Sequence, residues 1–218
     1  MIHWDQVPQS ERDDVVLKLM LIRHGLTDAN AASVIQGHQP TPLNAVGLAQ
    51  AKALGKRLAK QGPAFDVLVS SDLPRAVQTA EAIAVACNKP FALDAAWRER
   101  GFGPWEGKPH PQADIWRAAG AEASPAGAEE TSSFRARIVG ALAGLSRTYH
   151  QHDTVAVVTH GGPCRMILRL LIEGDLPTDP SAPKAELTTI ANCSIMHLQY
   201  SGGVWRLECL NDVLHLAT

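Results

Sequence analysis

The stretch that decides the fold runs Val15-Val16-Leu17-Lys18-Leu19-Met20-Leu21-Ile22-Arg23-His24-Gly25. Its apolar part is interrupted by a single lysine, whose methylene stem can lie along apolar surface. Such a run of β-branched and long aliphatic side chains predicts a buried strand. A cation, an imidazole and a glycine follow at once. A strand that ends in this way delivers a base or a nucleophile to the edge of an α/β sheet, where ligands bind.

Shorter apolar runs alternate with amphipathic segments along the rest of the chain. Short strands are predicted at 67–71, 91–93 and 154–159, followed by a hairpin at 190–200 and 204–210. Apolar residues at helical spacing predict helices near 45–61, 74–84, 134–145 and 164–173. Asp72 is the expected N-cap of the second helix, with Pro74 in its first turn. The alternation predicts an α/β fold of three layers, α/β/α, with a mainly parallel central sheet and one antiparallel hairpin.

The length of 218 residues suits one large domain or two small ones. We interpret the polar, acidic segment 1–14 as an N-terminal extension and 15–218 as a single domain. Within that domain, 101–133 is rich in Gly, Pro, Ala and Trp and has poor periodicity. A segment of this kind is expected to form a small lid inserted over a site.

Composition narrows the classes of function. With 20 basic and 22 acidic residues the net charge is −2, so nucleic acid is not an expected partner. No apolar run reaches the length of a transmembrane helix and residues 1–14 do not resemble a signal peptide, so we expect a cytoplasmic protein with no membrane partner. Four widely spaced cysteines without a CxxC pair argue against a zinc site. All four are predicted to be buried free thiols: Cys87, Cys164, Cys193 and Cys209.

Three predicted strand-to-helix junctions carry unusual polar groups. They are Arg23-His24-Gly25, Ser70-Ser71-Asp72-Leu73-Pro74-Arg75 and Thr159-His160-Gly161-Gly162. If the three strands are parallel neighbours, two arginines and two histidines converge at one edge of the sheet. Arginines offer bidentate donors, glycines let the backbone approach closely, and helix N-termini add amide donors. A pocket of this composition suits a phosphoryl group.

The chemistry then needs a nucleophile and a proton donor. The chain carries no GxSxG motif, so the expected nucleophile is an imidazole, which nearby arginines keep unprotonated. A neutral imidazole can attack phosphorus in line and form a phosphohistidine. A carboxylic acid protonates the leaving oxygen and afterwards activates water. Glu99 is the candidate for this acid, and Glu106 is its rival.

Taken in order, these motifs resemble the signatures of the histidine phosphatase superfamily, in its phosphoglycerate mutase-like branch. The segment Arg23-His24-Gly25-Leu26-Thr27-Asp28-Ala29-Asn30 is similar to the RHGxTxxN signature of that family. Further similar segments are Gln36-Gly37, Pro42-Leu43-Asn44, 70–80, Glu99 with Trp105-Glu106-Gly107, 159–162 and Asn192-Cys193-Ser194-Ile195. The resemblance covers 17–216, and an ordered set of motifs is far more specific than any one of them. It identifies 15–218 as a single histidine phosphatase-like catalytic domain.

Carried over by position, the resemblance implies a role for each residue of the site. His24 is the nucleophile that becomes phosphorylated, and Glu99 is the proton donor. The phosphoryl oxygens are held by Arg23, Arg75 and His160, with a backbone amide from Gly161. The substrate is expected to be bordered by Thr27, Asn30, Gln36 and Gly37. No metal and no organic cofactor is implied.

The expected activity is hydrolysis of a phosphomonoester in a small metabolite, as in α-ribazole phosphatases and broad-specificity phosphatases. The region between Glu99 and Phe134 is short and lacks a charge-bearing insert, which places a cofactor-dependent phosphoglycerate mutase second. A non-catalytic phospholigand-binding or interaction module is the third alternative. His38 and His110 are candidates for the rim of the site. The sequence leaves open the substrate and whether the chain forms a homodimer.

Overall fold

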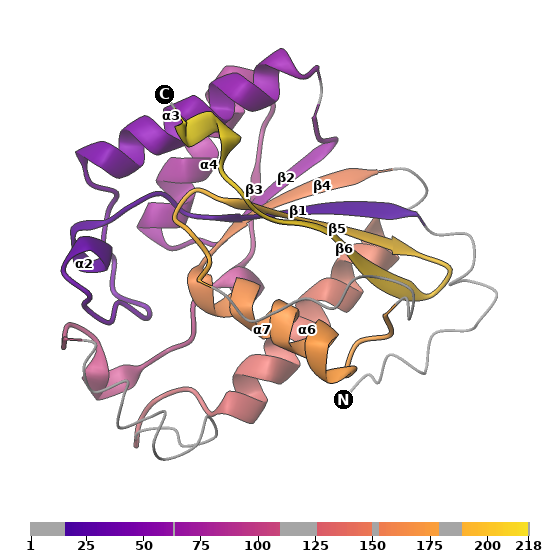
Figure 1. Cartoon of the computed structure of the whole chain (residues 1–218). Helices are drawn as coiled ribbons and strands as arrows, with labels where there is room; N and C mark the ends of the chain where they lie inside the picture. The colour runs from indigo at the N-terminus through magenta and orange to yellow at the C-terminus, as the bar shows by residue number, and fades with distance from the viewer. Residues whose placement is uncertain (1–15, 63, 110–125, 150–152, 179–188, 218) are drawn as a thin grey trace.

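The computed structural model describes residues 16–62, 64–109, 126–149, 153–178 and 189–217 (Figure 1). The expected N-terminal extension, 1–14, lies outside the described residues. So do 110–125, which form much of the expected lid, and with them His110. Of the lid, the structure describes a short 3₁₀ turn, η3 (Gly103–Trp105), and the loop before helix α6 (Thr131–Thr148).

One six-stranded sheet organises the described chain, in the order β3-β2-β4-β1-β5-β6. The strands are β1 (Leu17–Arg23), β2 (Val67–Ser70), β3 (Ala92–Leu93), β4 (Thr154–Thr159), β5 (Ile195–Ser201) and β6 (Val204–Asp212). β1 pairs in parallel with β4, and β4 and β3 each pair in parallel with β2. On the other side of β1, strands β5 and β6 form the predicted antiparallel hairpin. The mainly parallel sheet with one antiparallel hairpin is confirmed.

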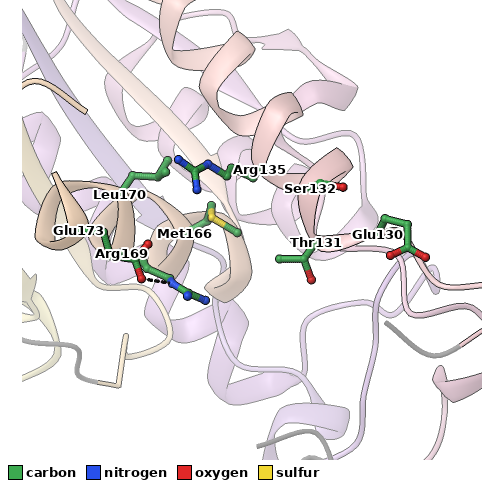
Figure 2. Close-up of a pocket in the computed structure, with 8 residues that line it drawn as sticks. All are labelled: Glu130, Thr131, Ser132, Arg135, Met166, Arg169, Leu170 and Glu173. Carbon is green, nitrogen blue, oxygen red and sulfur yellow. Dashed lines mark hydrogen bonds and ion pairs between the residues drawn. The ribbon is translucent and has the colours of Figure 1, made fainter. Parts of the chain in front are cut away.

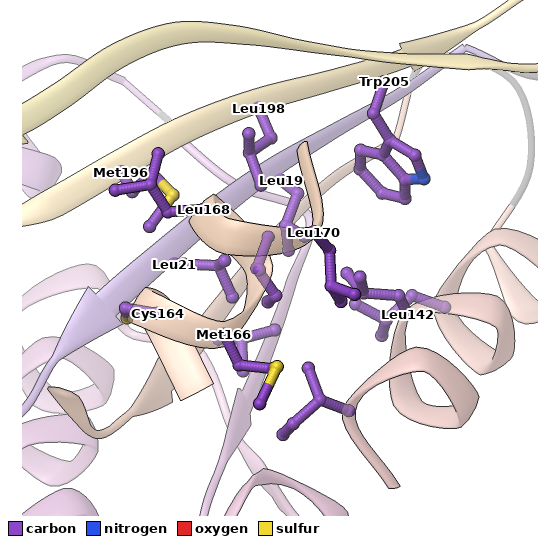
Figure 3. Packing of buried hydrophobic residues seen from close by; sticks show 14 of the residues in the cluster. Leu19, Leu21, Leu142, Cys164, Met166, Leu168, Leu170, Met196, Leu198 and Trp205 are labelled. Carbon is purple, nitrogen blue, oxygen red and sulfur yellow. The ribbon is translucent and has the colours of Figure 1, made fainter. Parts of the chain in front are cut away.

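Both faces of β1 are buried, which explains its nearly continuous apolar sequence. Leu19 and Leu21 point into a core that is shared with helix α6 and helix α7 (Gly161–Glu173) (Figure 3). Met20 and Ile22 point to the opposite face, where α3 (Ala45–Lys60) and α4 (Pro74–Cys87) pack. Two helices therefore cover each face of the sheet, and the three-layer α/β/α prediction is confirmed (Figure 1).

Several element boundaries differ from the prediction. The short helix after β1 is α2 (Asp28–Ala31), capped by Thr27. Helix α7 begins at Gly161, not at 164, and strand β5 begins at Ile195, not at 190. The remaining short elements are the 3₁₀ turns η2 (Ala95–Trp97) and η4 (Leu214–Leu216).

The prediction that Asp72 caps α4 is wrong. The N-cap residue is Leu73, which has no side-chain capping bond, and the Leu73 amide donates to the hydroxyl of Ser71. The carboxylate of Asp72 instead accepts hydrogen bonds from Nε and Nη2 of Arg98. A charge-assisted bidentate pair is stronger than a single capping bond, so it draws the carboxylate away from the helix end.

The cysteines are free thiols, as predicted, but they are not all buried. Cys164 and Cys193 are buried, and burial raises the pKa of each thiol to about 12. Cys87 is half-buried, and Cys209, on the edge strand β6, is exposed. Within the described ranges no helix is long and apolar enough to cross a membrane, and no cluster of three His, Cys, Asp or Glu residues could hold a metal ion.

Candidate active site

The three polar junctions meet at one edge of the sheet because β2, β4 and β1 are neighbours that run in parallel. The amide of His24 donates to the carbonyl of Thr159 at 2.9 Å, and the amide of Ser71 donates to the carbonyl of Val158 at 2.9 Å. The parallel hydrogen-bonding pattern therefore continues for one residue past the ends of β1 and β2. The rings of His24 and His160 consequently lie edge to face, with centroids 5.1 Å apart.

Local contacts fix the tautomer of His24. Nδ1 lies 2.7 Å from the carbonyl oxygen of Gly25, and a carbonyl can only accept a hydrogen bond. Nδ1 therefore carries the proton and Nε2 carries the lone pair. Consistently, Nε2 accepts a hydrogen bond from Nε of Arg75 at 3.2 Å. The unprotonated nitrogen of the imidazole thus faces Arg75 at this end of the sheet.

Arg75 is almost completely buried and is held by backbone carbonyls. Its terminal nitrogens donate to the carbonyl oxygens of Gln39 at 3.0 Å and Gly37 at 2.8 Å. Burial lowers the pKa of Arg75 to about 10, which leaves the guanidinium charged at neutral pH. Gly37 is required in this loop because its φ is +50° and a Cβ would lie 2.0 Å from a carboxylate oxygen of Glu106.

His160 and Arg23 each have a buried nitrogen with no hydrogen-bond partner among the residues that the structure describes. In His160 this atom is Nδ1, while Nε2 lies 2.8 Å from the hydroxyl of Ser71. In Arg23 it is Nε, while a terminal nitrogen donates to the carbonyl of Ile190. Buried polar atoms are rarely left unpaired, so these two mark the position where an anion would complete the site.

Both histidines have pKa values well below the ordinary histidine value. Burial is the main cause for each. The charges of Arg75 and then Arg23 act next on His24, and the carbonyl of Gly25 opposes them weakly. For His160 the cation of Arg75 again follows burial. Both imidazoles are therefore neutral at physiological pH, as a nucleophile and a neutral donor require.

The side chain of Glu99, in the loop after η2, contacts the N-terminus of helix α7. One carboxylate oxygen accepts from the amide of Gly162 at 3.0 Å, and the other accepts from the amide of Arg100 at 2.9 Å. Its negative charge raises the pKa values of both Arg23 and Arg75, which places it beside the same cations. The rival, Glu106, also raises the pKa of Arg75, and one of its oxygens accepts hydrogen bonds from the backbone amides of His38 and Phe102 at 3.0 Å each.

The family model that describes branch 1 of the histidine phosphatase superfamily matches residues 19–213. The chain belongs to this superfamily. A broad-specificity phosphatase of Saccharomyces cerevisiae is 34% identical over 73% of this chain and 72% of its own length. A probable phosphoglycerate mutase of Proteus mirabilis is 30% identical over 92% of this chain and 95% of its own. Among solved structures, a mycobacterial glucosyl-3-phosphoglycerate phosphatase is 28% identical, with a TM-score of 0.75 over 89% of this chain and 98% of that one.

The fold gathers the predicted site residues of this histidine phosphatase, but not all in the expected manner. Thr27 is fully buried, and its hydroxyl contacts the side-chain oxygens of Asn30 and Gln36 at 3.0 Å each. Both oxygens are thereby drawn into the turn after β1. The carbonyl of Gly37 holds Arg75. These four residues shape the site, and their direct contact with substrate stays a prediction.

Sequence reasoning assigns no role to Asn192 or to Arg137, because both act through contacts with residues far away in the chain. Asn192 donates from its side chain to the carbonyls of His24 and Gly25, at 3.1 and 3.3 Å. Arg137, on α6, donates to the carbonyls of Ala96, Arg98 and Glu99 and pairs with Glu129. His38 lies at the rim, with Nε2 2.8 Å from the carbonyl of Glu99, as its candidacy for the rim predicted.

A separate surface pocket lies between α6 and α7 (Figure 2). Its lining residues are Glu130, Thr131, Ser132, Arg135, Met166, Arg169, Leu170 and Glu173. None of them belongs to the junctions that carry the two histidines. Its two arginines are paired, Arg169 with Glu173 and Arg135 with Asp175. The chemistry of the histidine phosphatase site therefore does not extend to this pocket.

Proposed function

We propose that the chain is a phosphomonoester hydrolase that acts on a small phosphorylated metabolite through a phosphohistidine on Nε2 of His24. The observation that carries this proposal is the fixed tautomer of His24. The proton on Nδ1 is held by the Gly25 carbonyl, and the lone pair on Nε2 is directed at Arg75. A group that only bound phosphate would serve better as a donor at Nε2 than as an acceptor.

In the first step Nε2 attacks phosphorus and forms the N–P bond while the ester P–O bond breaks. Glu99 gives its proton to the leaving oxygen, so a neutral alcohol departs. The charge on the phosphoryl oxygens is stabilised by Arg23, Arg75, the Nδ1–H of His160 and the amide of Gly161. The unpaired Arg23 Nε and His160 Nδ1 support this assignment because each needs an acceptor.

In the second step the carboxylate of Glu99 takes a proton from water, and the water oxygen attacks phosphorus. The N–P bond breaks, and its electron pair returns to Nε2 of His24. Inorganic phosphate leaves, and both side chains recover their starting protonation states. The amide of Gly162 and the charge of Arg23 favour the carboxylate form that the second step needs, and they hold the Glu99 side chain beside the phosphoryl site for both steps.

Trapping of the intermediate tests the proposal. The protein is incubated with ³²P-labelled p-nitrophenyl phosphate and then quenched in alkali. We expect acid-labile, alkali-stable label on the wild type and none on H24A. The matched control is H197A, which changes a histidine in mid-strand β5 that contacts Asp212 rather than the site. Phosphate release at the uncatalysed background rate by both H24A and the wild type would support the non-catalytic alternative, and equal release above background would refute His24 as the nucleophile.

The mutase alternative differs only in the acceptor of the phosphoryl group. The names of the relatives include both reactions, so transfer to phosphoglycerate is measured directly against transfer to water. With 3-phosphoglycerate and a catalytic amount of 2,3-bisphosphoglycerate, we expect phosphate release to exceed interconversion of the two phosphoglycerates. Faster interconversion would make the mutase the better assignment. The cytoplasmic location stays a prediction from the sequence.

A further inference from the structure

Gly25 stands between the two peptide groups that decide how the ring of His24 is held. Its Cα packs against helix α3 so closely that a Cβ would lie 2.6 Å from the carbonyl oxygen of Gly47. Glycine is therefore required at this position. Because a glycine restrains its own backbone less than any other residue, the orientation of both peptide groups depends on contacts with other parts of the chain.

The first peptide group, between His24 and Gly25, is held at both ends by distant side chains. The amide of Gly25 donates to the hydroxyl of Thr79 at 3.1 Å. That hydroxyl donates its own proton to the carbonyl of Arg75 at 2.8 Å, which leaves its oxygen to accept from the amide. At the other end, the side chain of Asn192 donates to the carbonyl of His24 at 3.1 Å. Helix α4 therefore carries Arg75 and also holds the backbone beside the nucleophile.

The second peptide group, between Gly25 and Leu26, carries the carbonyl that holds the proton of His24. This carbonyl lies 2.7 Å from Nδ1 of His24, and it accepts a second hydrogen bond from the side chain of Asn192 at 3.3 Å. At the other end, the amide of Leu26 donates to the side-chain oxygen of Gln50 at 2.9 Å. Asn192 thus contacts both peptide groups, and Gln50 contacts the second.

We propose that Thr79, Gln50 and Asn192 are positioning residues for the nucleophile. They hold the Gly25 carbonyl in the orientation that keeps the proton on Nδ1 of His24 and leaves the lone pair on Nε2 for the attack on phosphorus. Thr79 is fully buried and so lies out of reach of a substrate. The inference rests on the proposed function, because it treats His24 as the nucleophile, but the tautomer itself can be measured without catalysis.

Substitutions at Thr79 separate the hydroxyl from the space that the side chain fills. T79V keeps the shape and leaves the amide of Gly25 without its acceptor, whereas T79S keeps the hydroxyl and loses a methyl group. With p-nitrophenyl phosphate we expect kcat/KM to fall about tenfold or more in T79V and to stay within about threefold of the wild type in T79S. Inhibition by inorganic phosphate is expected to change less than about threefold in both, because the groups that bind phosphate remain.

The two amide side chains allow the same comparison. Q50L removes the acceptor of the Leu26 amide and Q50E keeps an acceptor oxygen, so this pair tests the proposal even if T79V does not fold. N192L removes the donors to both peptide groups and is expected to lower kcat/KM about 10- to 100-fold.

The matched control is S146A. It removes a hydroxyl that donates to the carbonyl of Ala143 within helix α6, on the opposite face of the sheet, and we expect it to keep the rate of the wild type. Thermal melting establishes which variants are folded at the assay temperature. An equal loss in T79S and T79V, or in Q50E and Q50L, would overturn the proposal, because the loss would then not come from the missing acceptor.

NMR of ¹⁵N-labelled protein tests the tautomer directly and keeps this inference separate from the proposed function. The ring nitrogens of His24 report which of them carries the proton, and their signals are identified by their loss in H24N. We expect the proton on Nδ1 in the wild type and T79S, and an increased share on Nε2 in T79V and N192L. This result would stand even if no phosphohistidine formed. An unchanged tautomer in folded T79V and N192L would refute the positioning role and leave the phosphatase proposal intact.

Discussion

The substitution Gly162→Ala tests the role of Glu99 without changing any titratable group. A Cβ at this position would lie 1.8 Å from one carboxylate oxygen of Glu99 and 2.8 Å from its Cδ. Real Cβ atoms do not approach other heavy atoms within 3.0 Å, so the carboxylate must move by more than an ångström. The movement also lengthens the 3.0 Å hydrogen bond from the Gly162 amide.

A displacement of this size costs a positioned acid much of its effect, which amounts to a factor of about 10². We expect kcat/KM for an alkyl phosphate such as glycerol 3-phosphate to fall by about that factor in G162A, because kcat/KM reports only the steps up to the departure of the leaving group. For p-nitrophenyl phosphate the fall is expected to be less than about tenfold, because p-nitrophenolate leaves without a proton. E99Q is expected to show the same dependence on the leaving group.

The control is G140A in helix α6, where nothing lies within 4 Å of the added Cβ. Alanine favours a helix interior over glycine, so G140A is expected to keep full activity and gain up to about 1 kcal/mol of stability. Rates are measured by phosphate release and folding by thermal melting. The reasoning is refuted if a folded G162A loses the same factor on both substrates, or if it loses nothing on either.

Three further outcomes are expected. Burial holds the pKa values of His24 and His160 below 6.5, so the unfolded chain binds more protons than the folded protein once the pH falls below that value. The stability that these two histidines contribute is therefore full above pH 6.5 and declines below it. Urea unfolding at pH 7.5 and 5.5 should show a smaller decline in H24N than in the wild type. S71A removes the partner of His160 Nε2 and is expected to lower kcat/KM about tenfold, with no change in the far-ultraviolet circular dichroism spectrum. R137M removes the donors that hold the carbonyls of Arg98 and Glu99 and should reproduce the leaving-group dependence of G162A, whereas R135M, which removes a side chain that pairs with Asp175, should not.

Local chemistry made much of the fold predictable. A strand buried on both faces needs apolar side chains at every position, so β1 was visible in the sequence, and so was β4. Helix α3 was visible from apolar residues at helical spacing, with Asn44 as its side-chain cap. The predicted cap of α4 failed because Asp72 binds Arg98, which is 26 residues away. No local pattern records a contact of that kind.

The sequence by itself determined which groups stand at the ends of β1, β2 and β4, because each motif is contiguous with its strand. It also supplied Glu99 and Glu106 as rival acids. Only the tertiary structure shows how their surroundings differ, with Glu99 on the amides of Gly162 and Arg100 and Glu106 on the amides of His38 and Phe102. The tautomer of His24 was likewise decided in three dimensions. Hydrogen bonds and charge interactions depend on distances of a few ångströms between residues far apart in the chain, and those distances exist only once the sheet and its helices have packed.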